Sequence, residues 1–180
     1  MEAQLAEVRF RSLYDEHGRD LLAYALRRTP NPEDAADILA ETFLVAWRRS
    51  AEVPPGSEAR LWLFGVARRV LANQLRAEHR RIRLSERLRI EVVDEVADLP
   101  HPEGEDSGVL AALASLPPED RELLMLIAWE ELTPGQAARV LGVSPVAARS
   151  RLLRARRRLR RELDREEPIQ AERDVNEVDR

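Results

Sequence analysis

One stretch of the chain, residues 144–163, restricts the possible fold more than any other. Its apolar side chains recur at three- and four-residue intervals, which is the spacing of one face of an α-helix. They are Ala148, Leu152, Ala155, Leu159 and Leu163. Residues 145–161 also hold eight arginines and no acidic residue, although the whole chain has a formal net charge of −4. The stretch therefore predicts an amphipathic helix with a strongly basic outer face.

This basic face indicates binding to nucleic acid. A helix face that merely meets water usually mixes acidic and basic residues at i,i+4. Here no acidic residue follows Ser144 until Glu162, and guanidinium groups without counter-charges repel one another. A polyanion such as DNA would neutralise them, so we interpret the face as a surface for phosphates and bases. An ordinary solvated face is the alternative.

The residues before this helix carry the signals of a helix-turn-helix. Thr133 and Ser144 are each followed by proline, the preferred order of an N-cap and the first helical position. Gly142 lies between them, where a left-handed residue can end the first helix. A recognition helix that contacts bases with its first turns and phosphates further along fits this order.

Composition predicts an all-α chain with two small helical domains. Leu, Ala, Arg and Glu are frequent, and all four are good helix formers. We expect helical domains at residues 5–89 and 108–163. Residues 90–107 between them are rich in acidic residues, proline and glycine, which predicts a flexible acidic linker. The polar residues 164–180 predict a disordered tail.

Prolines divide the first domain into three or four expected helices. Asn31 followed by Pro32 predicts the start of one of them. Its apolar residues recur at helical spacing and predict a buried face. They are Ile38, Leu39, Phe43, Ala46 and Trp47.

Several classes of function find no support in the residues. The chain has no cysteine, its three histidines are scattered, and it has no glycine-rich phosphate loop or nucleophile elbow. We therefore expect no metal site, no cofactor and no enzymatic activity. The first residues lack the pattern of a signal peptide, and apolar runs are far shorter than the ~20 residues of a membrane span. A cytoplasmic protein without membrane insertion is expected.

At this point the motifs resemble a known family. The segments "LASLPPEDR", "GQAA", "LGVS" and "SRLLRAR" resemble the promoter-reading region 4 of bacterial sigma-70 family factors, especially the extracytoplasmic-function (ECF) branch. The segments "EDAADILAETFLVAWR" and "ARLWLFGVARRVLANQLR" resemble region 2 of the same family. The resemblance covers about residues 5 to 163. It implies a sigma factor that binds core RNA polymerase and reads promoter DNA.

The resemblance implies three sets of binding residues. Polymerase docking would use Asp37, Leu39, Ala40, Glu41 and Leu44, although Asp37 on a solvated face is an equal alternative. Recognition of the melted −10 element would use Arg68, Arg69, Asn73, Arg76 and Arg80. The −35 element would be contacted by Arg149, Ser150, Leu153 and Arg154, with Arg151, Arg156, Arg157 and Arg158 on phosphates.

Two further segments of the first domain carry expectations. The loop "SAEVPPGSEAR" resembles the loop that helps the family choose its −10 sequence. Trp62 and Phe64 follow it, and they either stack on unpaired bases or belong to the core, which is the more common role at helical spacing.

The resemblance also implies partners. These are the β′ clamp and β flap of core RNA polymerase, promoter DNA, and an anti-sigma factor. The acidic linker either follows the RNA exit path or is a plain tether. A stand-alone helix-turn-helix regulator that acts without polymerase is the main alternative, and it leaves the first domain unexplained.

Overall fold

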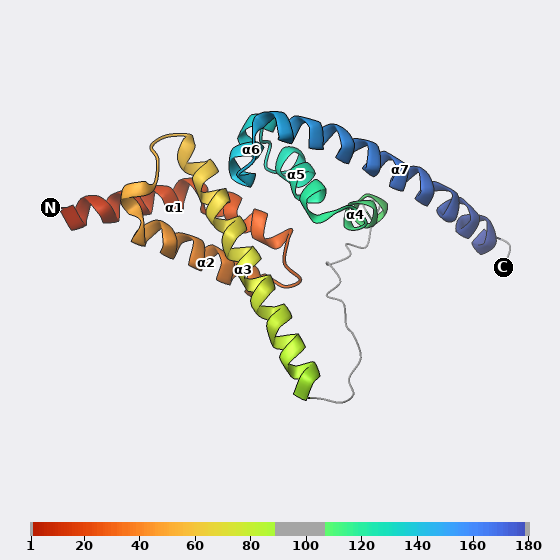
Figure 1. Ribbon diagram of the computed structural model, residues 1–180, viewed down its shortest axis with the longest axis horizontal. Helices are drawn as coiled ribbons and strands as arrows, with labels where there is room; N and C mark the ends of the chain where they lie inside the picture. Colours follow the sequence, from red (N-terminus) through yellow and green to blue (C-terminus); the bar gives the residue numbers. More distant parts are fainter. Residues whose placement is uncertain (1, 89–106, 179–180) are drawn as a thin grey trace. The chain divides into compact units, whose positions relative to one another are not determined.

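The computed structural model of the 180-residue chain describes residues 2–88 and 107–178. Within these residues it contains seven α-helices and one short 3₁₀ helix, with no strand (Figure 1), which confirms the predicted all-α class. The chain divides into two compact units, Met1–Pro100 and His101–Arg180. The expected linker, residues 90–107, falls outside the described residues except for Ser107.

The first unit contains α1 (Glu2–Leu26), α2 (Pro32–Arg48), the 3₁₀ helix η1 (Ser50–Glu52) and α3 (Glu58–Leu88). The expected start of α2 is confirmed, because the Asn31 side chain accepts a hydrogen bond from the Asp34 backbone N–H at 2.8 Å. This bond satisfies one of the free N–H groups at the start of the helix.

The core of the first unit lies where the three long helices meet. The side chains of Leu21, Tyr24, Ile38, Leu63 and Phe64 are all essentially buried. The rings of Tyr24 in α1 and Phe64 in α3 lie 5.4 Å apart. Phe64 is therefore a core residue and not a platform for bases.

The predicted buried face of α2 is correct with one exception. Ile38, Phe43 and Ala46 are buried and Leu39 is half-buried, but the Trp47 side chain is 45% exposed. Trp47 lies at the edge of the helix pair, where its ring meets Phe10 of α1 edge-on at 5.3 Å. The prediction failed for Trp47 because the helical period of α2 shows which side faces α1, but not how far along α2 the contact with α1 extends.

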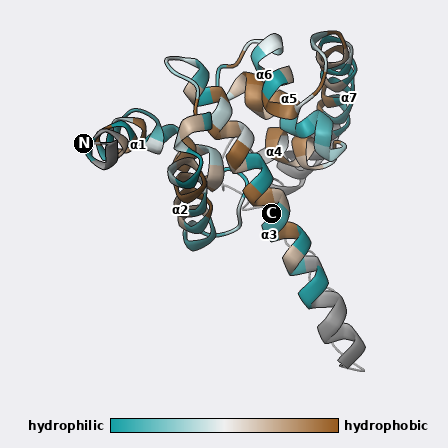
Figure 2. Ribbon diagram, turned by 60° about the vertical axis from the view of Figure 1, so that its left-hand side comes forward, coloured by the Kyte–Doolittle hydropathy of each residue, from teal (hydrophilic) through white to brown (hydrophobic). Residues whose placement is uncertain are grey.

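The second unit contains α4 (Ser107–Ala114), α5 (Pro118–Ala128), α6 (Pro134–Leu141) and α7 (Pro145–Val178). Helix α7 packs against the other three. Its buried positions Ala148, Leu152 and Ala155 lie on the predicted stripe. Figure 2 shows hydrophobic and hydrophilic residues interspersed along α2 and α7, as expected for helices with one buried face.

The predicted helix-turn-helix is confirmed at its caps. The Thr133 side chain accepts from the Gln136 N–H, and the Gln136 side chain accepts from the Thr133 N–H at 2.9 Å, which forms a capping box. Gly142 ends α6 in the left-handed region, at φ 69°. Ser144 then accepts from the Ala147 N–H at 3.1 Å and caps α7.

Helix α7 continues through residues 164–178, part of the segment for which the polar sequence predicts a disordered tail. Cooperativity favours the continuation, because a helix already nucleated by packing extends without a new nucleus. Glu162 and Arg165 support the continuation with an ion pair at 3.2 Å. In the described part of the chain, no helix is both long enough and apolar enough to cross a bilayer.

Candidate nucleic-acid and polymerase interfaces

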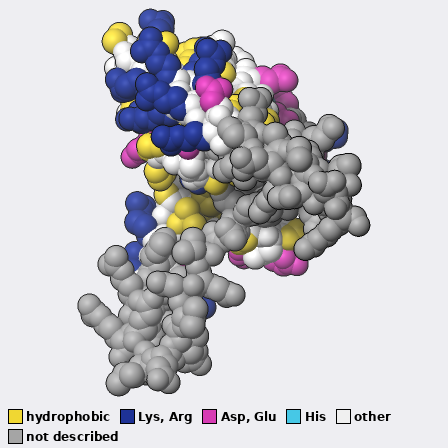
Figure 3. Space-filling view, turned by 90° about the vertical axis from the view of Figure 1, so that its right-hand side faces the viewer, with side chains coloured by type: hydrophobic (Ala, Val, Ile, Leu, Met, Phe, Trp, Pro, Cys, Tyr) yellow, Lys and Arg dark blue, Asp and Glu magenta, His cyan; other side chains and the backbone are white. Residues whose placement is uncertain are grey.

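The outer face of α7 presents the predicted −35 residues to solvent. Most of the set is exposed, including Leu153 at 54%. Exposed members are Arg149, Ser150, Leu153, Arg154, Arg156, Arg157 and Arg158, and Arg151 is half-buried. Arginine side chains gather in Figure 3 at the top of the view, the level at which α7 begins in Figure 1. The structure thus brings these residues together on one basic face.

Arg158 departs from the prediction that all eight arginines lack a counter-charge. Its guanidinium donates a hydrogen bond to the carboxylate of Asp120 in α5. The Asp120 side chain is only 7% exposed, whereas that of Arg158 is 47% exposed. The sequence pattern missed this pair because its members lie 38 residues apart. Arg158 therefore ties α7 to α5 within the second unit.

Arg121, one residue further along, explains the "LASLPPEDR" motif in physical terms. Its guanidinium donates to the carbonyl oxygens of Leu113 at 2.8 Å and Leu116 at 3.3 Å, and also to that of Ala114. These carbonyls lie at the end of α4 and just beyond it, where carbonyl groups lack regular helical partners, although that of Leu113 also accepts from the Leu116 N–H at 3.2 Å. Burial lowers the pKa of the Arg121 guanidinium. The motif arginine is thus a clamp between α4 and α5.

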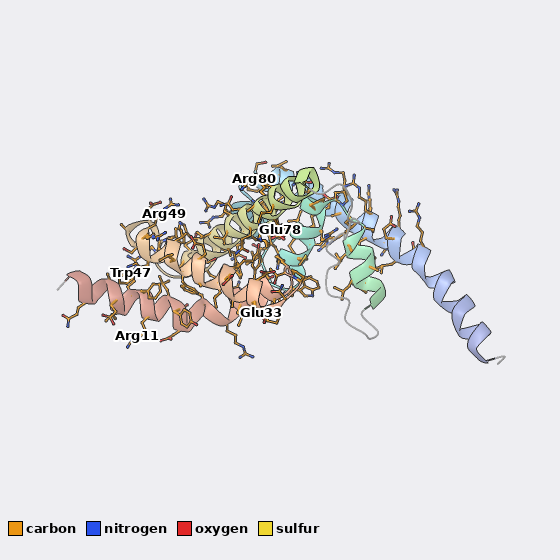
Figure 4. The ribbon with its side chains drawn as sticks, turned by 90° about the horizontal axis from the view of Figure 1, so that it is seen from below. Arg11, Glu33, Trp47, Arg49, Glu78 and Arg80 are labelled. Carbon is orange, nitrogen blue, oxygen red and sulfur yellow. The ribbon has the colours of Figure 1, made fainter. Side chains whose placement is uncertain are left out.

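The predicted −10 residues of α3 form one exposed stripe, with one exception. Arg69, Asn73, Arg76 and Arg80 are exposed at spacings of four, three and four residues, so they share a helix face. The Arg76 guanidinium donates to Asn73 Oδ1 at 2.6 Å, and Arg69 Nε donates to the Gly65 carbonyl at 2.8 Å. Arg68 is half-buried beside this stripe. Figure 4 labels Arg80 on α3.

The predicted docking residues of α2 also share one face. Asp37, Ala40, Glu41 and Leu44 are exposed, and their spacing of three, one and three residues places them side by side. Leu39 is half-buried and points towards α1, because it lines the groove between the two helices. The face combines two carboxylates with exposed apolar surface.

That groove between α1 and α2 was missed by the sequence analysis. It has a volume of about 940 Å³, and the aromatic residues Phe10, Tyr14 and Trp47 are part of its lining (Figure 4 labels Arg11 and Trp47). Tyr14 is 48% exposed, and its ring lies 4.9 Å from that of Phe43. The i,i+4 spacing of Phe10 and Tyr14 was the available signal. The groove extends the apolar part of the α2 face.

The loop between α2 and α3 has a defined shape. Arg49 Nε donates to Glu52 Oε1 at 2.9 Å; this hydrogen bond and the opposite charges raise the pKa of Arg49 and lower that of Glu52. Arg9 of α1 donates to the backbone carbonyl of Val53, whose side chain is buried. Gly56 adopts φ 61°, a left-handed value that glycine tolerates without strain. Helix α1, the loop and the start of α3 line a second, open pocket of about 840 Å³.

Two family models and several curated proteins match this chain. The family model described as Sigma-70 region 2 matches residues 13–81, and that described as Sigma-70, region 4 matches residues 108–159. The RNA polymerase sigma factor NccH of Alcaligenes xylosoxydans xylosoxydans is 32% identical over 164 residues, which cover 87% of this chain and 88% of that protein. The ECF RNA polymerase sigma factor SigL of Mycobacterium tuberculosis is 32% identical over 161 residues, covering 83% and 86%.

Two solved structures are similar over most of the chain. The sigma factor RpoE of Bartonella quintana, in complex with the anti-sigma factor NepR, has a TM-score of 0.67 at 27% identity and covers 86% of this chain and 96% of that one. CnrH in complex with the cytosolic domain of CnrY has a TM-score of 0.62 at 25% identity, covering 90% and 94%. By sequence, by the two matched regions and by fold, this chain belongs to the sigma-70 family of RNA polymerase sigma factors, in its ECF branch.

Proposed function

We propose that this chain binds core RNA polymerase and directs promoter-specific transcription initiation. The observation that carries the proposal is that one chain holds both an exposed acidic and apolar face on α2 and two separate basic faces, on α3 and α7. A stand-alone helix-turn-helix regulator needs only the α7 face. The match to both sigma regions therefore disfavours that alternative.

Helix α7 reads the −35 element as duplex DNA. Arg149, Ser150, Leu153 and Arg154 lie on the exposed face of its first turns, the part of a recognition helix that reaches base edges in the major groove. Arg151, Arg156 and Arg157 bind the flanking phosphates. Arg158 holds α7 on α5 through Asp120, so its part in phosphate binding is secondary.

Helix α3 captures the melted −10 strand. Arg69 and Asn73 offer hydrogen-bonding groups to an extruded base, while Arg68, Arg76 and Arg80 neutralise the strand's phosphates. The binding energy for the open strand, and no chemical step, drives melting. The chain acts in the cytoplasm with polymerase and has no active site of its own.

The α2 face docks on the β′ clamp. Asp37 and Glu41 pair with basic groups there, and Leu39, Ala40 and Leu44 supply the apolar contact, while the second unit reaches the β flap. Because two similar solved structures contain RpoE with the anti-sigma factor NepR and CnrH with a domain of CnrY, an anti-sigma factor is proposed as the regulator of this chain.

Run-off transcription with purified core polymerase on fragmented genomic DNA of the host tests the proposal. We expect transcripts that share a promoter motif and appear only when the chain is added. Asp37→Arg should abolish them while leaving the fold intact by circular dichroism. Glu119→Arg, the same charge change at an exposed position of the second unit, is the control and should leave them.

Failure of core polymerase to bind the chain would refute the proposal. Nanomolar, sequence-specific binding of the chain to DNA without polymerase would instead support a stand-alone regulator, because such affinities are typical of specific DNA-binding proteins acting alone.

A further inference from the structure

We infer that Val146, in the first turn of α7, reads the C5-methyl group of a pyrimidine in the −35 element. The inference rests on the proposed function, which places the first turns of α7 at the base edges of the major groove and assigns no contact to Val146. The Val146 side chain is 69% exposed, more than any other large apolar side chain among the residues that the structure describes. Within the described second unit, the next most exposed is Leu153, at 54%.

The first argument is the direction in which Val146 points. At about 100° per residue, Val146 lies about 160° around the helix from Ala148, which is fully buried. The same geometry places Leu153 within about 20° of Val146, and Ser150 within about 40°. Val146 therefore extends the face proposed to read bases by one turn, towards the start of α7.

The second argument is the chemistry of that face. A single apolar residue on a protein surface is ordinary, but Val146 and Leu153 share this face with a row of exposed arginines. The charge of the arginines favours DNA as the partner. The apolar group that DNA displays in its major groove is the C5-methyl of thymine, and 5-methylcytosine displays the same group at the same ring position. Val146 therefore matches a methylated pyrimidine.

The third argument is that the contact group is held in place before DNA arrives. Ser144 accepts a hydrogen bond from the Ala147 N–H at 3.1 Å, and Pro145 begins α7, so cap and proline together fix the backbone at Val146. Valine in a helix strongly prefers one χ1 rotamer, so little side-chain entropy is lost on contact. Valine is also a weaker helix former than alanine, so helix stability does not explain its presence.

The two exposed apolar residues contact different base pairs. Leu153 follows Val146 by seven residues, about 10.5 Å along the helix at 1.5 Å per residue. Stacked base pairs of B-DNA lie about 3.4 Å apart. Val146→Ala should therefore change methyl recognition at one position, and Leu153→Ala should change recognition at another.

Binding of the holoenzyme to duplex promoter DNA tests the contact. In one series of probes, each thymine of the −35 element found by run-off transcription is replaced in turn, on either strand, by deoxyuridine, which lacks only the methyl group. In a second series, each cytosine is replaced in turn by 5-methylcytosine, which adds it. At one position we expect an effect of about fourfold on affinity, a loss with deoxyuridine or a gain with 5-methylcytosine, because burying one methyl group contributes about 0.8 kcal/mol.

The effect at that position should fall below about twofold with Val146→Ala, whose shorter side chain does not reach the methyl group. Val8→Ala is the matched control, since Val8 is 68% exposed but lies in α1 of the first unit, and it should keep the wild-type response. Equal responses of wild type and Val146→Ala to every probe would overturn the inference. A uniform loss of affinity on all probes, or weaker binding of Val146→Ala to core polymerase without DNA, would also overturn it.

The outcomes separate this inference from the proposed function. If the wild-type chain directs no promoter-specific transcription, the proposed function fails. The same two series are then built on duplexes that the full chain alone selects from a random pool, and the response of Val146→Ala decides whether this residue reads a methyl group. A chain that selects no duplex would overturn both.

Discussion

Replacing Arg158 by alanine should destabilise the second unit far more than the same change at its neighbour Arg157. Arg158 is the hydrogen-bond partner of Asp120, whose carboxylate is 7% exposed. Breaking a fully buried ion pair costs about 3–5 kcal/mol because one charge stays buried and unpaired. Arg158 is half-exposed, which weakens the pair, and Asp120 lies in the first turn of α5, where the helix dipole still favours a carboxylate.

We therefore expect a loss of about 2 kcal/mol for Arg158→Ala. Arg157 is exposed, so its removal should change the free energy of unfolding by less than about 0.5 kcal/mol. Because the chain has two compact units, unfolding of the second must be followed separately. Trp129 reports on it by fluorescence during urea unfolding once Trp47 and Trp62, both in the first unit, are replaced by phenylalanine.

A double-mutant cycle with Asp120→Ala completes the test. The two changes should be strongly non-additive, because either one removes the same pair. Equal, small effects of Arg157→Ala and Arg158→Ala on unfolding, together with equal losses of DNA affinity, would refute the reasoning and make Arg158 an ordinary phosphate-binding residue.

Three further predictions concern the strained turn, the DNA face and the loop. Glu131 adopts φ 55°, a left-handed backbone conformation that is unfavourable for residues other than glycine. Glu131→Gly should therefore raise the free energy of unfolding in urea titrations by about 0.5–1 kcal/mol. A lower free energy of unfolding would contradict this prediction. Arg156→Ala should reduce the slope of log affinity for promoter DNA against log salt by about 0.9, whereas Arg154→Ala should instead relax the −35 preference, as measured for holoenzyme on variant promoters. Arg49 lowers the pKa of Glu52, so the pair stabilises the loop above the ordinary Glu pKa, and this contribution is lost as the pH falls through the lowered pKa. In Arg49→Ala, the Glu52 pKa measured by nuclear magnetic resonance should rise. An unchanged Glu52 pKa would contradict the pairing.

The caps and helix faces were predictable from the sequence because they depend on neighbours within one or two turns. Asn31 and Thr133 accept hydrogen bonds from N–H groups three residues later, and Gly142 turns the chain at the position its type suggests. The basic stripe of α7 follows from its period alone. For the same reason the resemblance to the sigma family could be carried by short motifs.

The tertiary structure decided which side chains are shared between helices. It paired Arg158 with Asp120 across 38 residues and Arg9 with Val53 across 44. It also left the Trp47 side chain 45% exposed, although the helical period predicts that it is buried. No local pattern encodes these outcomes, because they depend on the distances between helices that packing sets.

The candidate sites divide in the same way. The residues predicted for α2, α3 and α7 each lie on a single helix, and helical period placed most of them on an exposed face, with Leu39, Arg68 and Arg151 half-buried. The aromatic groove and the pocket between α1 and the loop each need more than one segment of the first unit. Helical period shows which way a side chain faces, but only the packed structure decides whether another segment covers it, bonds to it or leaves it free to bind a partner.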